Sequence, residues 1–251
     1  MIKQLKHKTA EEVLSLSTPK NIKNADFVFD ENGMYSLTKE NAEKAAACIK
    51  EDKHYKSPSY KEYYENCGKS LKYYSHDEIY GILKRISSAN STRTPNKDIC
   101  AIAEYILNNR TAFLSRLNSG DVGLVEELAE IEGLKRREFS LASKICEYLS
   151  ELEFGKAQYV ISDSVVRRIL PYYLAYYDIP YKKGLSVENI SYSELADFIL
   201  KLLQKIPEKL DCRELDRILW YCYKNDSVRC AVACSLIEKD RPTRFRQKAR
   251  R

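Results

Sequence analysis

The stretch SKICEYLSELEFGKAQYVISDSVV, residues 143–166, holds the body of one helical pattern and the start of the next. Apolar residues recur at helical spacing before Gly155 and again after Asp163. The glycine marks a turn between the two patterns. A lysine, Lys144, stands near the start of the first pattern, and Asp163 opens the second. We therefore expect two consecutive helices that carry Lys144 and Asp163 at their N-terminal ends.

The same helical spacing recurs along most of the chain, and alternating strand-like runs are scarce. A capping box of Ser75 and Glu78 begins one helix, and Asp211 begins another. Pro171 is expected to kink or end a third helix. The sequence therefore predicts an all-α, multi-helix globular protein. The expected helices cover 38–52, 75–88, 96–118, 121–131, 140–152, 163–178, 191–206, 211–225 and 227–239.

Three regions are predicted from the distribution of loops. The loop-like stretch SANSTRTPNK, residues 88–97, ends an N-terminal helical region, 1–97. A helical core follows at 98–225, and a last helix with a basic tail occupies 226–251. No apolar run approaches the roughly 20 residues that span a bilayer, and the charged N-terminus lacks the apolar segment of a signal peptide. We therefore expect a cytoplasmic protein without a membrane partner.

The cysteines do not form a recognisable metal motif. The chain has 8 cysteines but no CxxC, and its closest pair, Cys230 and Cys234, has no histidine nearby. Cys146, Cys222 and Cys230 lie in apolar helical patterns, which favours reduced, buried thiols over disulfides. We therefore expect neither a metal nor a cofactor.

Basic and aromatic residues allow two interpretations. The net charge is +6, and the tail DRPTRFRQKARR, residues 240–251, is strongly basic. Such a tail suits contact with phosphates, or it is a solvated terminus. Residues 59–76 interleave lysine with tyrosine, as surfaces that stack nucleic-acid bases do. Alternatively, these tyrosines cover contacts between helices.

Lys144 and Asp163 are more informative together than singly. Each has an ordinary structural explanation, since an aspartate before a helix caps its free N–H groups and a surface lysine is common. Together, they suggest a site in which nearby cations and helix N-termini favour a neutral, nucleophilic amine. The aspartate then stabilises positive charge that develops on a sugar. Cations on both sides are candidates for phosphate contacts: Lys135, Arg136, Arg137, Arg167 and Arg168.

Residues 121–170 resemble the helix–hairpin–helix DNA glycosylase superfamily, in particular its 8-oxoguanine-glycosylase-like branch. Bifunctional members carry a lysine at the start of a helix and an aspartate at the start of another. The matching residues are Lys144 in SLASKICEYL and Asp163 in YVISDSVV. The resemblance implies that Lys144 displaces the base and forms a Schiff base with the sugar, with support from Asp163. The chain departs from the family in EGLKRREFSLASK, where Gly133 stands alone in place of a glycine-rich hairpin, and no proline closely precedes Asp163.

The leading hypothesis is therefore a DNA base-excision enzyme, a glycosylase with or without abasic-site lyase activity, that acts on a flipped modified base. The alternative is a non-catalytic helical nucleic-acid-binding module in a defence or repair complex. A third hypothesis is a protein-interaction module that uses the tyrosine-rich helices. DNA is the expected partner, while RNA and protein partners stay open.

Overall fold

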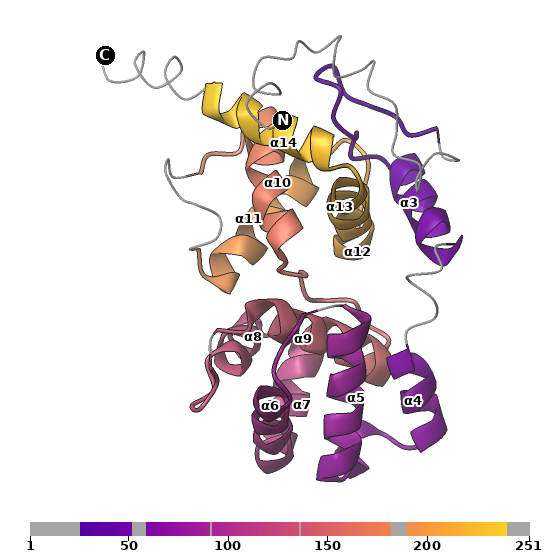
Figure 1. Ribbon diagram of the computed structural model, residues 1–251, viewed down its shortest axis with the longest axis vertical. Coiled ribbons are helices and arrows are strands. Elements are labelled where there is room, and N and C mark those ends of the chain that lie inside the picture. Colours follow the sequence, from indigo (N-terminus) through magenta and orange to yellow (C-terminus); the bar gives the residue numbers. More distant parts are fainter. Residues whose placement is uncertain (1–25, 52–58, 91, 136, 182–189, 240–251) are drawn as a thin grey trace. The chain divides into compact units, whose positions relative to one another are not determined.

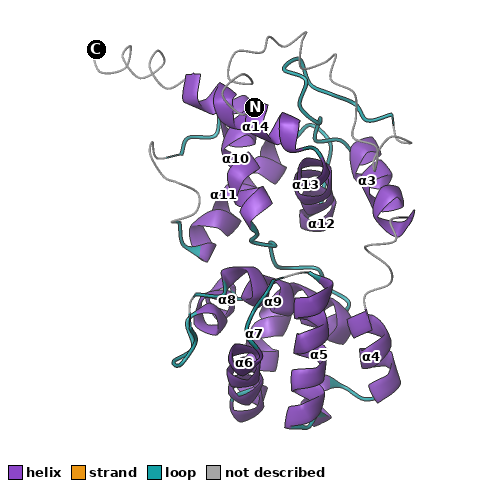
Figure 2. Cartoon of the chain, viewed as in Figure 1, coloured by secondary structure: helices purple, strands orange, loops and turns teal. Residues whose placement is uncertain are grey.

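The computed structural model describes residues 26–51, 59–90, 92–135, 137–181 and 190–239. Within these ranges the chain consists of helices and loops (Figure 2). The described residues contain no β-strand, and their β-type pairing is limited to an isolated bridge between Phe29 and Tyr35. The prediction of an all-α globular protein is confirmed. Arg136 and the basic tail, 240–251, lie outside the described residues.

The chain is divided into two compact units, each assembled from separate segments. The first unit comprises Met1–Asp52, Ser164–Ile190 and Phe198–Arg251, and the second comprises Lys53–Asp163 and Ser191–Asp197. These divisions fall at other positions than the predicted boundaries after residues 97 and 225. The loop at 88–97 connects two helices that pack against each other within the second unit.

The second unit is built around one long helix, α9, against which α5, α7 and α8 pack. Helix α5 also packs against α4 and α6. In the helix predicted for residues 75–88, the apolar side chains that face the core are Ile79, Ile82, Leu83 and Ile86. The helices of this unit, labelled in Figure 1, are α4 (Ser59–Cys67), the short 3-10 helix η3 (Leu71–Tyr73), α5 (His76–Ala89), α6 (Asn96–Asn108), α7 (Arg110–Ser119), α8 (Val122–Ala129) and α9 (Phe139–Phe154).

Local sequence signals set most helix ends in the second unit. The capping box predicted at Ser75 and Glu78 begins α5, with both reciprocal hydrogen bonds present. The single helix predicted for 96–118 is instead two helices that meet at Asn109, whose N–H still donates to the carbonyl of Tyr105. Gly120, with a φ of 70°, ends α7 in the left-handed conformation that glycine tolerates best.

Most of the tyrosines between residues 59 and 76 serve contacts between helices. Tyr60 is buried and stacks on Tyr148 of α9, with ring centroids 4.8 Å apart. Tyr64 donates to the carboxylate of Glu153 at 2.7 Å, and Tyr74 is buried. Tyr73 differs, because it is 65% exposed. Among the tyrosines of this stretch, it is the one most open to a stacking base.

The first unit packs α10 against α14 and η4, and α3 against η4. Helix α10 continues past Pro171 to Tyr176. The buried neighbours of the proline, Leu170, Tyr172 and Tyr173, hold this turn in the core despite the missing N–H donor. The helices here are α3 (Lys39–Glu51), α10 (Ser164–Tyr176), α11 (Tyr192–Lys205, whose first turns belong to the second unit), α12 (Cys212–Asp216), the π-helical η4 (Arg217–Cys222), α13 (Tyr223–Asn225) and α14 (Ser227–Lys239).

The core of the first unit contains a buried ion pair. Arg229, 1% exposed, donates to Asp226 at 2.7 Å and to the carbonyl of Gly33 at 2.9 Å. Its guanidinium lies 4.3 Å from the centroid of the Phe29 ring. Tyr35 also donates to Asp226, at 3.1 Å. The loop around residues 29–35 is therefore attached to the start of α14 by buried polar contacts.

None of the described helices combines the length and apolar character that crossing a bilayer requires. The eight cysteines, all of them in the described residues, form no disulfide with one another, and Cys146, Cys222 and Cys230 are buried, as predicted.

Candidate functional site

A helix–turn–helix pair, α8 and α9, lies at the centre of the region that resembles the glycosylases. Asp121 caps α8 by accepting the N–H of Gly123 at 2.9 Å. The turn between the helices closes when the N–H of Glu138 donates to the carbonyl of Ala129 at 3.1 Å. Gly133, with a φ of 90°, gives the turn a backbone conformation that other residues rarely adopt. Within the described part of residues 121–154, α8, this turn and α9 thus follow one another directly.

Two buried carboxylates, Asp98 on α6 and Glu138 on the turn, connect this turn to the segment at the start of α6. The N–H of Lys135 donates to Asp98 at 3.3 Å, and the hydroxyl of Thr94 donates to Glu138 at 2.9 Å. Asp98 is 1% exposed and Glu138 is 3% exposed. The backbone amide of Lys135 therefore binds a carboxylate of the protein itself.

Lys144 is the sixth residue of α9 and is almost fully buried. Its side chain is 4% exposed, and its Nζ donates to the hydroxyl of Ser140, one turn earlier, at 3.1 Å. Asp163 directly precedes Ser164, the first residue of α10, and is 8% exposed. The predicted positions at the beginnings of two helices are confirmed, and both side chains are held inside the protein.

A hydrogen bond joins the immediate neighbours of these two residues. The N–H of Ser162 donates to the hydroxyl of Ser143 at 3.0 Å, and both serines are buried. One turn further along α9, Glu147 accepts the N–H of Tyr159 at 2.9 Å. The segment before Asp163 therefore lies along α9, and the second unit brings the backbone of Lys144 and the backbone of Asp163 into the same neighbourhood.

The predicted phosphate contacts are distributed over both units. Lys135 and Arg137 are exposed on the turn before α9, where Arg137 forms a solvent-facing ion pair with Glu130 at 3.0 Å. Arg136 lies outside the described residues. In the first unit, Arg168 is exposed, whereas Arg167 is 8% exposed and donates to the carbonyl of Ile190 at 3.3 Å. Among the five predicted phosphate contacts, Lys135, Arg137 and Arg168 are thus the described residues whose side chains face solvent.

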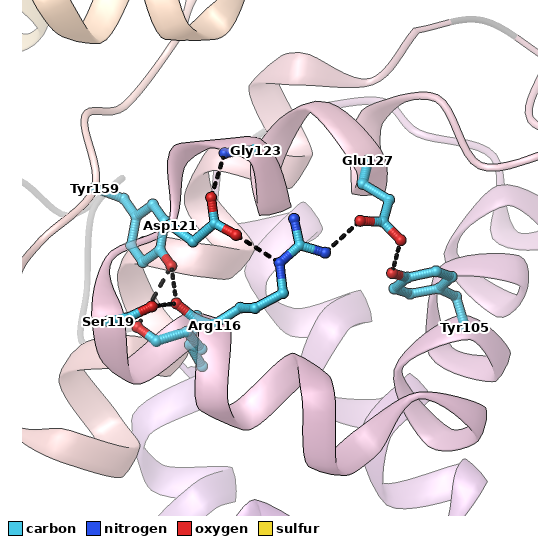
Figure 3. Close-up of polar contacts among 8 residues, drawn as sticks. Tyr105, Arg116, Ser119, Asp121, Gly123, Glu127 and Tyr159 are labelled. Atoms are coloured by element: carbon cyan, nitrogen blue, oxygen red, sulfur yellow. Dashed lines mark hydrogen bonds and ion pairs between the residues drawn. The ribbon is translucent and has the colours of Figure 1, made fainter.

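A polar network centred on Arg116 fixes α8, and the sequence did not single it out. Figure 3 shows the guanidinium of Arg116 between two carboxylates, Asp121 at 2.6 Å and Glu127. Glu127 also accepts the hydroxyl of Tyr105. Tyr159, from the segment that leads to Asp163, donates to the carbonyl of Arg116 at 3.1 Å. The network therefore connects α6, α7 and α8 with the segment that carries Asp163.

The charges in this network shift one another's protonation. The hydrogen bond to Arg116 lowers the pKa of Asp121 and the pKa of Glu127. Burial, followed by the hydrogen bond to Glu127, raises the pKa of Tyr105 to about 12. The two carboxylates therefore stay ionised, and the tyrosine stays neutral, at neutral pH.

A family model described as HI_0787_N, N-terminal domain, matches residues 38–153, somewhat less than half of the chain. The match includes Lys144 and most of the Arg116 network, namely Tyr105, Arg116, Asp121 and Glu127, and it ends before Tyr159 and Asp163. Its description states no activity. No curated protein and no solved structure matches the chain.

Proposed function

We propose that this chain is a DNA base-excision enzyme, a glycosylase in which Lys144 is the nucleophile and Asp163 the supporting carboxylate. The hydrogen bond between Ser143 and Ser162 is the observation that carries the proposal, because it holds the two predicted residues in one neighbourhood. The order of α8, turn and α9 supports it as well.

The chemistry follows from the two side-chain types. The neutral amine of Lys144 attacks the sugar carbon that bears the base, and the base departs with the electrons of the glycosidic bond. The negative charge of Asp163 stabilises the positive charge that develops on the sugar. The attached nitrogen then loses a proton, and the bond from the sugar carbon to the ring oxygen breaks as that oxygen takes up a proton, which leaves a Schiff base. Elimination from this Schiff base is the lyase step that the resemblance implies.

The burial of both groups sets a requirement on the substrate. Lys144 is 4% exposed and Asp163 is 8% exposed, so a base still stacked in a duplex cannot reach them. The target nucleotide has to leave the stack, and the protein has to admit it beside α9. Lys135 and Arg137, exposed on the preceding turn, are the cations of this unit proposed to contact phosphates.

Borohydride trapping tests the proposal. The protein is incubated with duplexes that carry an abasic site or an oxidised base, and the reduced covalent adduct is measured. We expect an adduct that is lost in Lys144→Gln and retained in Lys156→Gln, which removes an exposed lysine of the same unit. An adduct of unchanged yield in Lys144→Gln refutes the assignment of the nucleophile. If neither an adduct nor base release forms on any duplex, the enzymatic proposal fails.

A non-catalytic nucleic-acid-binding module is the second candidate function. The burial of Lys144 and Asp163 favours it, because exposed cations such as Lys135 and Arg137 bind a backbone without any opening of the protein. Binding that weakens with salt and is unchanged in both Lys144→Gln and Asp163→Asn is the result expected of such a module.

A further inference from the structure

A sulfur, a nitrogen and an oxygen converge where α5 and α6 pack together in the second unit. His76 is the first residue of α5, while Cys100 and Glu104 stand one turn apart on α6. The sulfur of Cys100 lies 3.7 Å from Nε2 of His76 and 3.9 Å from Oε1 of Glu104. The three potential ligand atoms all lie within 4.8 Å of one another. The cluster thus joins two helices whose residues are well separated in sequence.

These separations match the edges of a small tetrahedral metal site. Zinc–sulfur and zinc–nitrogen bonds of about 2.3 Å and about 2.1 Å, at a tetrahedral angle, place sulfur and nitrogen about 3.6 Å apart. The sulfur–oxygen edge has nearly the same expected length. The observed separations of 3.7 Å and 3.9 Å therefore need only a small closure of the side chains around an ion.

The donor types narrow the choice of ion. A thiolate, an imidazole and a carboxylate suit zinc and related late transition metals, whereas magnesium and calcium prefer oxygen alone. The thiolate of Cys100 and the carboxylate of Glu104 carry two negative charges, which balance a divalent cation. We therefore take a zinc-class ion as the ligand.

The other ring nitrogen of His76, Nδ1, lies near an exposed carboxylate, the kind of group that often accompanies a zinc-binding histidine. Nδ1 of His76 lies 3.4 Å from the carboxylate of Asp77. A carboxylate in this position accepts a hydrogen bond from the protonated Nδ1 and so favours the tautomer in which Nε2 carries no proton. Nε2, the nitrogen that faces Cys100, can then bind a metal ion through its lone pair. The tautomer that binds a metal is therefore the one that Asp77 stabilises.

The cluster is also open to solvent. His76 and Cys100 are half-buried and Glu104 is exposed. Three protein ligands with an accessible fourth position are typical of zinc sites that keep a bound water, whereas structural sites are closed by four protein ligands. We propose that His76, Cys100 and Glu104 bind a zinc-class divalent cation, with water as the fourth ligand. This site revises the expectation from cysteine spacing that the chain holds no metal.

Cobalt(II) is a direct probe of the site, because a thiolate bound to cobalt gives a strong near-ultraviolet charge-transfer absorption. The full-length chain is reduced, freed of metal with a chelator and titrated with Co²⁺ alone. We expect one equivalent to produce the thiolate absorption and Zn²⁺ to abolish it by displacement. Cys100→Ser should lose the absorption, while Cys67→Ser, at a half-buried cysteine of the same unit outside the cluster, should retain it.

The other ligands are tested by affinity. Glu104→Gln, at an exposed position, should weaken Co²⁺ binding by about 100-fold or more, and Asp77→Asn by about tenfold, the lower end of the range for groups that orient a ligand. The proposal is overturned if no thiolate absorption forms, if Cys100→Ser retains it, or if Glu104→Gln binds as tightly as the unaltered chain. None of these measurements involves nucleic acid, so they do not depend on the proposed enzymatic function.

Discussion

Replacement of Ser143 by alanine tests the contact that brings the segment of Asp163 beside α9. Ser143 is 0% exposed, and its hydroxyl accepts the N–H of Ser162 at 3.0 Å. Alanine keeps the helix and nearly the same volume but removes the acceptor. The buried N–H then loses that partner, and the positioning of Asp163 loses one of its restraints.

The variant loses the hydrogen bond to the buried N–H of Ser162 and a longer one, 3.3 Å, that the hydroxyl donates to the carbonyl of Ser140. The expected cost is about 1–3 kcal/mol in the free energy of unfolding, mostly from the buried N–H that is left without its acceptor. Urea unfolding followed by circular dichroism measures it. Ser150→Ala is the matched control, since Ser150 is also 0% exposed on α9. The hydroxyl of Ser150 accepts the side-chain amide of Gln158 at 3.0 Å, and that amide also donates to the carbonyl of Leu117. We therefore expect Ser150→Ala to cost less, about 1 kcal/mol or below.

The same pair of variants connects stability with the proposed site. Under conditions where both variants are folded, Ser143→Ala should form the borohydride-trapped adduct more slowly than Ser150→Ala. If both variants unfold at the same urea concentration as the unaltered chain, the hydrogen bond does not contribute as argued. If Ser143→Ala is destabilised but traps DNA at the rate of the control, the segment at residue 162 does not position Asp163.

Two further predictions concern charged groups. Arg229→Met should lower the free energy of unfolding of the first unit by about 3–5 kcal/mol, because Asp226 keeps a buried charge without its cation; a loss below about 1 kcal/mol by urea unfolding contradicts this. Arg116 lowers the pKa values of Asp121 and Glu127 in the folded protein. The ionised carboxylates therefore stabilise the fold fully above their unfolded-state pKa values of about 4. This stabilisation should be lost as the pH falls through the lower folded-state pKa values. Acid titration of unfolding should show this loss, and Arg116→Gln should reduce it; an unchanged acid profile in Arg116→Gln refutes the coupling.

Local signals in the sequence account for much of the fold. The capping boxes at Ser75 and Asp211 are formed, because each depends on side chains three residues apart and on nothing distant. The start of α10 after Asp163 follows from the same kind of signal. The continuation of α10 through Pro171 does not, because the packing of buried neighbours outweighs local propensity there.

The polar sites were harder to predict because their members are distant in sequence. His76 and Cys100 are 24 residues apart, and no spacing rule relates the start of one helix to the middle of the next. Arg116 meets Asp121 and Glu127 only because Gly120 turns the chain between α7 and α8. The local signal for this network is Asp121 directly before α8, as a helix cap, with an arginine five residues earlier in the sequence.

For Lys144 and Asp163, the sequence predicts the position of each residue on its helix but not its burial. The sequence placed both residues at the beginnings of helices, and the structure puts their neighbours Ser143 and Ser162 in hydrogen-bond contact. Their burial was not foreseen, because it depends on how α8, α9 and the segment before α10 pack together. The division of the cations between two units could not be predicted from the sequence either, since Arg167 and Arg168 are only four and five residues after Asp163.

The central proposal is tested most directly by identifying the lysine that carries the sugar. Protein trapped with borohydride on an abasic-site duplex is digested with a protease and a nuclease, and the modified peptide is sequenced by mass spectrometry. We expect the sugar remnant on Lys144, within the peptide that contains SKICEYL. A remnant on any other lysine, or on the N-terminal amine, contradicts the proposed site.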